Sequence, residues 1–337
     1  MTLSRPTAET ADASGSVRRT GTGIGRAAVV LVLVTLAVAI PLLGPSAALH
    51  GTGEAAAPGA GGVALLRAML FAALCLPLGE LSVRRLARSV PGASPDRPRS
   101  WAPWAAAVGA VAALGLAAVV ATGNHVPHRL SQIDFGGLYA SRDGKLALLE
   151  INAFLVAGLC ARTYRSSVQV WPLGAVVVAE ALRAHPPTEH TPMVGSGLTA
   201  VHLTCAALWA GGLLHVLRTL RRWGPTGQGA ALLGRYARVA AVLLAAVTAT
   251  GVWSSLRRMP SGTILTQLTD TAYGRTLLAK VLLVAVVAVL ALCARLRLRR
   301  APDPLAACVP ARAEVVALGL VVVVSGLLTA LPLPIRW

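Results

Sequence analysis

One apolar stretch of this 337-residue chain carries side chains that could bind a metal ion in a hydrophobic setting. It begins at His202 and includes Cys205, Trp209, Gly211 and Gly212. Successive helical residues are rotated by about 100°, so His202, Cys205 and Trp209 fall on one stripe. Imidazole is the commonest metal ligand, and a histidine within hydrocarbon is a candidate functional residue. We therefore predict a metal site at His202 with Cys205 beside it, although buried cysteine often only packs. Trp209 is expected to pack, and the two glycines to let another helix approach.

Further imidazole and thioether groups lie in two short polar segments. His125 and His128 lie in the first, and His185, His190 and Met193 lie in the second. Imidazole together with thioether suits copper, whereas zinc sites more often contain carboxylate or thiolate. These five residues are predicted to capture a copper ion, which is the only metal or cofactor that the pattern indicates.

Other residues with reactive side chains form no recognisable catalytic pattern. The five cysteines are scattered and form neither a CxxC zinc motif nor an even disulfide framework. The sequence has no nucleophile elbow, phosphate-binding loop, HExxH motif or catalytic carboxylate pair, so it does not indicate an enzyme. Glu150 and Lys280 fall inside apolar runs. Because buried charges in membranes usually pair, we predict that these two residues form an ion pair.

Long apolar runs must position all these side chains. The chain is 55% hydrophobic and 13% charged, with a mean hydropathy of +0.67, which is typical of a polytopic helical membrane protein. A hydrocarbon core of ~30 Å requires ~20 residues per helix. The runs predict an all-α bundle of about nine transmembrane helices, at residues 27–48, 62–82, 101–122, 145–162, 168–184, 196–218, 236–256, 275–295 and 313–332.

Arginine is distributed unequally among the connections between these runs. The N-terminal segment and the second, fourth, sixth and eighth connections hold most of the 31 Lys and Arg residues. All but one of the histidines lie in, or just below, the other connections, as do Met69, Met193 and Met259. The positive-inside rule then predicts a multi-pass membrane protein with a cytoplasmic N-terminus and an outer C-terminus. The net charge of +18 comes from arginines in the short connections between apolar runs, where they face the lipid bilayer surface. No nucleic-acid partner is therefore expected.

Two parts of the chain resemble each other. Ala121–Gly123 (Ala-Thr-Gly) recurs as Ala249–Gly251, and Gly144 followed by a basic residue recurs as Gly274. Four predicted helices separate the copies, which indicates a parallel repeat; chance similarity among Ala- and Gly-rich runs is the alternative. The expected organisation is a disordered cytoplasmic segment at 1–26, a first helix and outer loop at 27–60, and two four-helix halves at 61–184 and 185–337.

The motifs from His202 onward resemble those of the copper resistance D (CopD) family. His202–Gly212 resembles the family's H-x6-W-x-G-G signature, and Arg235–Arg238 (Arg-Tyr-Ala-Arg) and Thr250-Gly251 follow in order. The next match is to T-x-YGR-x-LL-x-K, which here contains Tyr273, Gly274, Arg275 and Lys280, and Glu314 then opens the last span. The resemblance covers about residues 168–332.

This resemblance implies copper uptake or copper tolerance across the bacterial inner membrane, often beside a separate periplasmic CopC-like partner. It matches His202 directly. It also relates His185 to the histidine of a Gly-His pair, although Ala184 precedes it here. We expect a membrane protein that binds copper and moves it across the bilayer.

Two alternatives remain open. A non-transporting factor could deliver copper to an oxidase. A b-type cytochrome would need two intramembrane histidines at similar depth, whereas His202 and His215 share one helix and lie ~20 Å apart by helical rise.

Overall fold

The computed structural model describes residues 21–55, 57–123, 129, 133–163, 166–224, 226–259, 262–300 and 304–333. Regular structure within these ranges is entirely helical, which confirms the all-α prediction. The long helices are α1 (Gly21–Leu49), α2 (Ala60–Arg88), α3 (Ala102–Ala121), α5 (Arg142–Arg162), α6 (Val170–Arg183), α7 (Pro192–Trp223), α8 (Gly227–Arg258), α10 (Ala272–Arg300) and α11 (Pro304–Leu328). Two short helices, α4 (Phe135–Ala140) and α9 (Ile264–Asp270), precede α5 and α10, and the 3-10 turn Ser166–Gln169 precedes α6.

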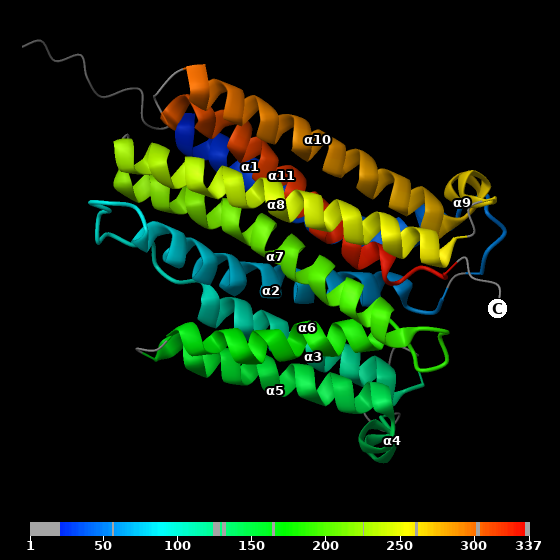
Figure 1. The fold of residues 1–337 in the computed structure, drawn as a ribbon. Coiled ribbons are helices and arrows are strands. Elements are labelled where there is room, and N and C mark those ends of the chain that lie inside the picture. The colour runs from blue at the N-terminus through cyan, green and yellow to red at the C-terminus, as the bar shows by residue number, and fades with distance from the viewer. Residues whose placement is uncertain are drawn as a thin grey trace, which may run out of the picture.

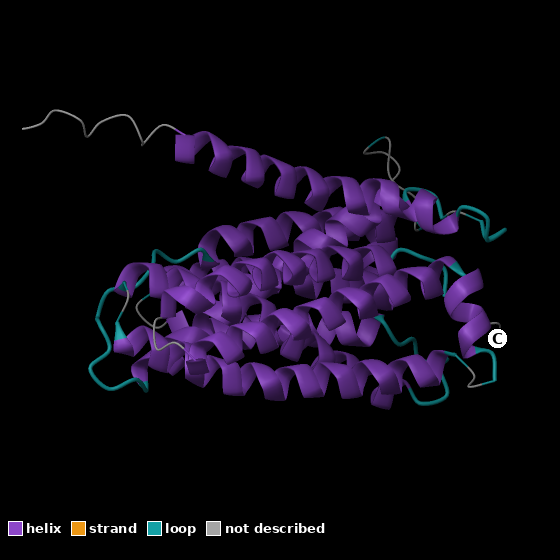
Figure 2. Ribbon diagram, turned by 90° about the horizontal axis from the view of Figure 1, so that it is seen from above, coloured by secondary structure: helices purple, strands orange, loops and turns teal. Residues whose placement is uncertain are grey.

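The long helices run alongside one another as roughly parallel rods (Figure 1). Seen from above, the loops gather at the two ends of the bundle (Figure 2). Helices α2, α3, α5 and α6 pack as one group and α7, α8, α10 and α11 as another, and α2 joins the groups by packing against α7 and α11. Helix α1 lies against α2, α10 and α11. The division of the chain into halves at 61–184 and 185–337 stays a prediction.

Eight helices of the described chain are long and apolar enough to cross a membrane. They are the long helices without α6, which has only 14 residues. Each of the nine predicted spans does contain a helix, but the count of nine transmembrane helices is not confirmed. At ~1.5 Å per residue α6 is ~21 Å long, which is short of a ~30 Å hydrocarbon core.

Glycine allows α2 and α7 to cross in backbone contact at the centre of the bundle. A Cβ atom added to Gly211 of α7 would lie 1.8 Å from the carbonyl oxygen of Cys75, and one added to Gly79 of α2 would lie 2.1 Å from the carbonyl carbon of Gly211. No residue with a side chain fits at either position without moving a helix. The crossing fixes the depth of α7, and therefore of His202, relative to the first group.

Two corners at one end of the bundle are built alike. Ser141 caps α5 by accepting a hydrogen bond from Gly144 N at 3.1 Å, and Thr271 accepts one from Gly274 N at 3.0 Å where α10 begins. A Cβ at Gly144 would lie 1.9 Å from Leu138 O of α4, and a Cβ at Gly274 would lie 2.0 Å from Gln267 O of α9. Each glycine thus lets a short helix fold back onto a long one, and this likeness supports the predicted repeat.

Candidate functional site

His202 of α7 faces α8, and its hydrogen bond there determines which ring nitrogen is free. Its Nδ1 lies 3.0 Å from Thr250 Oγ1, and that hydroxyl lies 2.7 Å from the Ala246 carbonyl oxygen. A hydroxyl has one proton to donate, and the carbonyl can only accept. Thr250 therefore accepts from His202, so Nδ1 carries the ring hydrogen. In a neutral ring Nε2 then keeps its lone pair, and the Val247 carbonyl, which also accepts from Thr250, is a second hydrogen-bonding group beside the ring. Metal-binding histidines have this arrangement, with one nitrogen held by a neighbour.

Two further residues define the surroundings of this half-buried ring. Gly251 follows Thr250, and a Cβ added there would lie 3.5 Å from His202 Cε1, so the glycine keeps this flank open. Lys280 of α10 lies close enough to act on His202 electrostatically. A protonated lysine here repels a cation at Nε2, so any metal ion at His202 must overcome this charge.

The other residues of the motif on α7 are placed by packing. Cys205 is a partly buried free thiol that packs against the core of the second helix group. Trp209 is buried, and its carbonyl oxygen accepts a 2.6 Å hydrogen bond from the Tyr236 hydroxyl. A Cβ at Gly212 would lie 2.7 Å from the Tyr236 ring, and Gly211 faces α2. The close helix approach predicted for both glycines is confirmed.

The ion pair predicted between Glu150 and Lys280 is wrong. Glu150 lies on α5 in the first helix group and pairs with Arg183 of α6, at 2.9 Å. Lys280 lies in the second group and makes no ion pair or hydrogen bond with any described residue. The predicted pair does not form because α5 packs on α3 and α6 and not on α10, so Arg183 of α6 is the cation beside Glu150.

The sequence reasoning missed the buried charge cluster to which this pair belongs. Arg183 also contacts Glu180 at 2.9 Å, and Arg67 of α2 binds both carboxylate oxygens of Glu180. Glu150 Oε1, Arg67 Nε and two Arg183 nitrogens are buried and form no hydrogen bond with any residue that the structure describes. The available signals were a lone arginine in the apolar first half of α2 and the i, i+3 spacing of Glu180 and Arg183.

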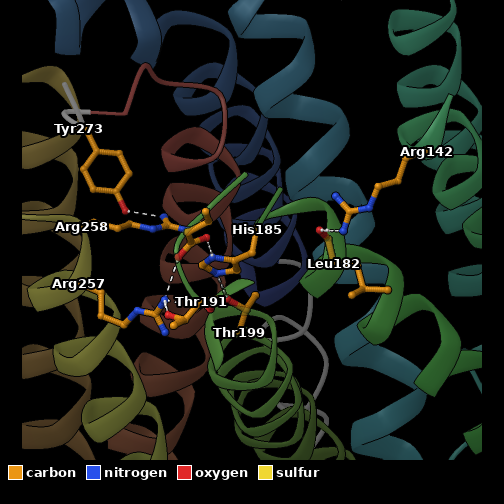
Figure 3. Close-up of polar contacts among 9 residues, drawn as sticks. Arg142, Leu182, His185, Thr191, Thr199, Arg257, Arg258 and Tyr273 are labelled. Atoms are coloured by element: carbon orange, nitrogen blue, oxygen red, sulfur yellow. Dashed lines mark hydrogen bonds and ion pairs between the residues drawn. The ribbon is translucent and has the colours of Figure 1, made fainter. Parts of the chain in front are cut away.

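His185 lies in a polar network that joins the connection between α6 and α7 to the end of α8 (Figure 3). Its Nδ1 is 2.5 Å from Glu189 Oε2 and its Nε2 is 3.0 Å from Thr199 Oγ1. Arg257 donates to Glu189 at 2.9 Å and to Thr191 Oγ1 at 2.6 Å. Both ring nitrogens are therefore occupied, and His185 can bind a metal only after one of these contacts opens.

The charge state of His185 follows from its position. Burial lowers the pKa of His185 below its ordinary value of 6.5, and Arg258 and Arg257 act in the same direction. The hydrogen bond and the negative charge of Glu189 oppose this shift. The imidazole is consequently neutral at neutral pH, which is the form a metal ion requires.

The remaining predicted capture residues are not brought together with His185. His190 and Met193 are exposed, and 76% of Met193 is accessible. His125 and His128 lie outside the described residues. The described residues contain no cluster of three or more His, Cys, Asp or Glu side chains that could hold a metal ion.

Tyr273, Gly274 and Arg275 hold one end of the bundle together. The Tyr273 hydroxyl accepts a hydrogen bond from Arg258 at 3.2 Å. Arg275 donates to the Thr269 carbonyl at 2.6 Å and to the His50 carbonyl at 2.9 Å, which ties the loop after α1 to α9 and α10. Their role in the structure is to close the α9–α10 corner, two helical turns before Lys280.

Comparison with known proteins is consistent with this arrangement. Residues 230–329, from α8 to the end of α11, match the family model described as copper resistance protein D, CopD. No curated protein and no solved structure matches the chain significantly. The matched region contains Thr250 and Lys280, which face His202. With its membrane-spanning helices the chain is a multi-pass membrane protein, and its residues 230–329 are similar to the copper resistance protein D family.

Proposed function

We propose that this protein binds copper at His202 and moves it across the bacterial plasma membrane, and so contributes to copper homeostasis and resistance. One observation carries the proposal: Thr250 holds the Nδ1–H of His202, while no hydrogen bond joins Nε2 to the side chain of any described residue. A neutral imidazole with a fixed tautomer can accept a soft or borderline cation without first losing a proton or breaking a hydrogen bond. The match to the CopD family supports copper as the cargo.

The proposed route begins at the end of the bundle where α7 starts. His190 and Met193 are exposed there, and His125 and His128 belong to the same set by sequence. These side chains would capture copper from the outer compartment, in which a separate CopC-like protein could deliver it. The N-terminus would then be cytoplasmic and the C-terminus outside. His185 would join only when its contacts with Glu189 and Thr199 open.

Below His202 the same stripe of α7 continues to Cys205. A thiol one helical turn further in offers a softer ligand than imidazole, which suits Cu(I). We propose that copper passes from His202 to Cys205 on its way inward. No residue of the proposed route acts as a catalyst, so we regard the protein as a carrier and not as an enzyme.

The test is copper binding and copper flux measured on the purified chain reconstituted in vesicles. His202→Ala should abolish the intramembrane site and reduce flux to the level of empty vesicles. Thr250→Val removes the oxygen that fixes the tautomer and should weaken copper binding about 10–100-fold, and Thr250→Ser should restore it.

His50→Ala is the matched control, because His50 is exposed and its side chain has no contact in the described chain. Its binding and flux should equal those of the unaltered protein. Unchanged flux with His202→Ala would exclude His202 as the ligand. Binding without any flux would favour a copper-delivery factor over a carrier.

A further inference from the structure

A second site lies at the opposite end of the bundle from His185. The segment between α2 and α3, residues 89–101, folds back beside the last turns of α2 and α7 and leaves a cavity of about 410 Å³. Its walls include Val83, Ala87 and Val90, together with the Trp223 ring. The volume is in the range of cavities that hold small ligands.

Side chains from α7 and α8 hold this segment in place, so the cavity exists without a ligand. Trp223 donates to the Asp96 carbonyl at 2.9 Å, and Arg218 donates to the Arg99 carbonyl at 2.6 Å while lying 3.6 Å above the Trp101 ring. From α8, Gln228 donates to the Gly92 carbonyl and Arg235 to Ser89. A preformed site loses little conformational entropy when it binds.

The polar groups at the base of the cavity are already paired. His215 Nε2 donates to the Leu76 carbonyl at 3.0 Å, and its Nδ1 accepts from Arg218 at 3.3 Å. Thr219 donates to the His215 carbonyl at 2.8 Å, and Glu80 pairs with Arg84. Neither the imidazole nor the carboxylate is therefore free to bind a metal ion.

The lining side chains that could bind a ligand are the guanidinium groups of Arg88 and Arg97. Both line the cavity, both are exposed, and neither has an ion pair or hydrogen bond with a described residue. Asp96 is the one lining carboxylate that forms no ion pair, so the unpaired charge around the cavity is net positive. Guanidinium groups bind phosphate through paired, charge-assisted hydrogen bonds.

We propose that this cavity binds a phosphate-bearing anion, with Arg88 and Arg97 on the phosphate and the apolar wall against the rest of the molecule. The site lies at the arginine-rich end of the bundle, where phospholipid headgroups and soluble phosphates both meet the protein. The phosphate could belong to either. The proposal does not depend on copper transport.

The test uses the purified full chain and two probes. Calorimetric titration with inorganic phosphate detects a soluble ligand. Native mass spectrometry detects a bound lipid, and comparing phosphatidylglycerol with zwitterionic phosphatidylcholine shows whether the headgroup must be anionic. Binding of either phosphate or phosphatidylglycerol supports the site and identifies its source. Arg88→Ala with Arg97→Ala should weaken that binding about tenfold for each guanidinium removed.

Arg85→Ala with Arg162→Ala is the matched control. Both residues are exposed at helix ends on the same side and do not line the cavity, so the charge removed is equal. This control should bind normally. Ala87→Phe should abolish binding by filling the cavity while leaving every charge in place. Absence of binding with both probes, an equal loss in the control, or full binding by either test variant would overturn the proposal.

Discussion

At the residue scale, the three histidines placed on or beside α7 differ in what their ring nitrogens contact. His202 has one nitrogen held by Thr250, and no described side chain is hydrogen-bonded to the other. His185 uses both nitrogens, on Glu189 and Thr199, and so does His215, on a carbonyl and a guanidinium. Because a bonded nitrogen has no lone pair or space to offer, only His202 is ready to bind a metal ion.

The charge of Lys280 should limit the affinity of His202 for copper. In Lys280→Met the repulsion is removed, and copper binding to the purified protein should tighten about tenfold, which corresponds to about 1.4 kcal/mol. Lys145→Met is the control, because Lys145 is an exposed lysine of α5 in the other helix group. Equal affinities for the two variants would mean that the Lys280 charge does not reach the site.

His185 should make the folded state sensitive to acid. Its pKa is lowered in the fold, so below about pH 6.5 the unfolded chain takes up a proton before the folded protein does. The contribution of His185 to stability is complete above that pH and is lost as pH falls toward the lowered pKa. The apparent melting temperature should therefore fall between about pH 7 and about pH 5.

In His185→Gln this decline should be shallower, because glutamine can still bond to Glu189 and cannot take up the proton. His190→Gln, in the same loop but exposed, should keep the slope of the unaltered protein. The charged groups that face His185 are Glu189, Arg257 and Arg258, and all three are retained in both variants. Identical slopes for the two variants would contradict the assignment.

At the scale of helices, the position of α7 is determined by its contact with α2. The backbone of Cys75 occupies the space that a side chain at position 211 would need. Moving the two helices apart would therefore break the packing between α2 and α7 where they cross. His202 lies between two and three turns from this crossing. The depth of His202 in the bundle thus depends on Gly211, a residue without a reactive side chain.

Replacing this glycine should be costly. In Gly211→Ala the methyl group meets backbone, which cannot rotate away, and we expect a loss of about 1–3 kcal/mol, seen as a lower apparent melting temperature. Gly197→Ala, on the same helix with nothing within 4 Å of the added Cβ, should be neutral or stabilising because alanine favours helix. A stable Gly211→Ala protein would show that α2 and α7 can move apart.

At the scale of the whole molecule, hydrophobicity predicted the long helices but not their ends. Helix α7 was expected at 196–218 and extends over Pro192–Trp223, because its arginine-rich last turns are helical without being apolar. The short helices α4 and α9 were missed, since segments of six and seven residues carry too little periodicity.

In the candidate site, too, the sequence predicted some features and missed others. Residue type and motif predicted His202, but Thr250 and Lys280 become its neighbours only because α8 and α10 pack beside α7. The pairing of Glu150 failed for the same reason, because a contact with Arg183 depends on how α6 ends and not on spacing along the chain. The sequence pattern therefore predicted a candidate ligand, whereas its neighbours depend on how the helices pack.

The shortness of α6 has a consequence for the surrounding lipid. A helix of ~21 Å cannot match a ~30 Å hydrocarbon layer, so the leaflets beside it must become thinner or let water and headgroups sink inward. The charged cluster of Arg67, Glu150, Glu180 and Arg183 lies where α6 ends. A dimple in the bilayer on this flank would hydrate that cluster and reduce the cost of keeping four charges at membrane depth.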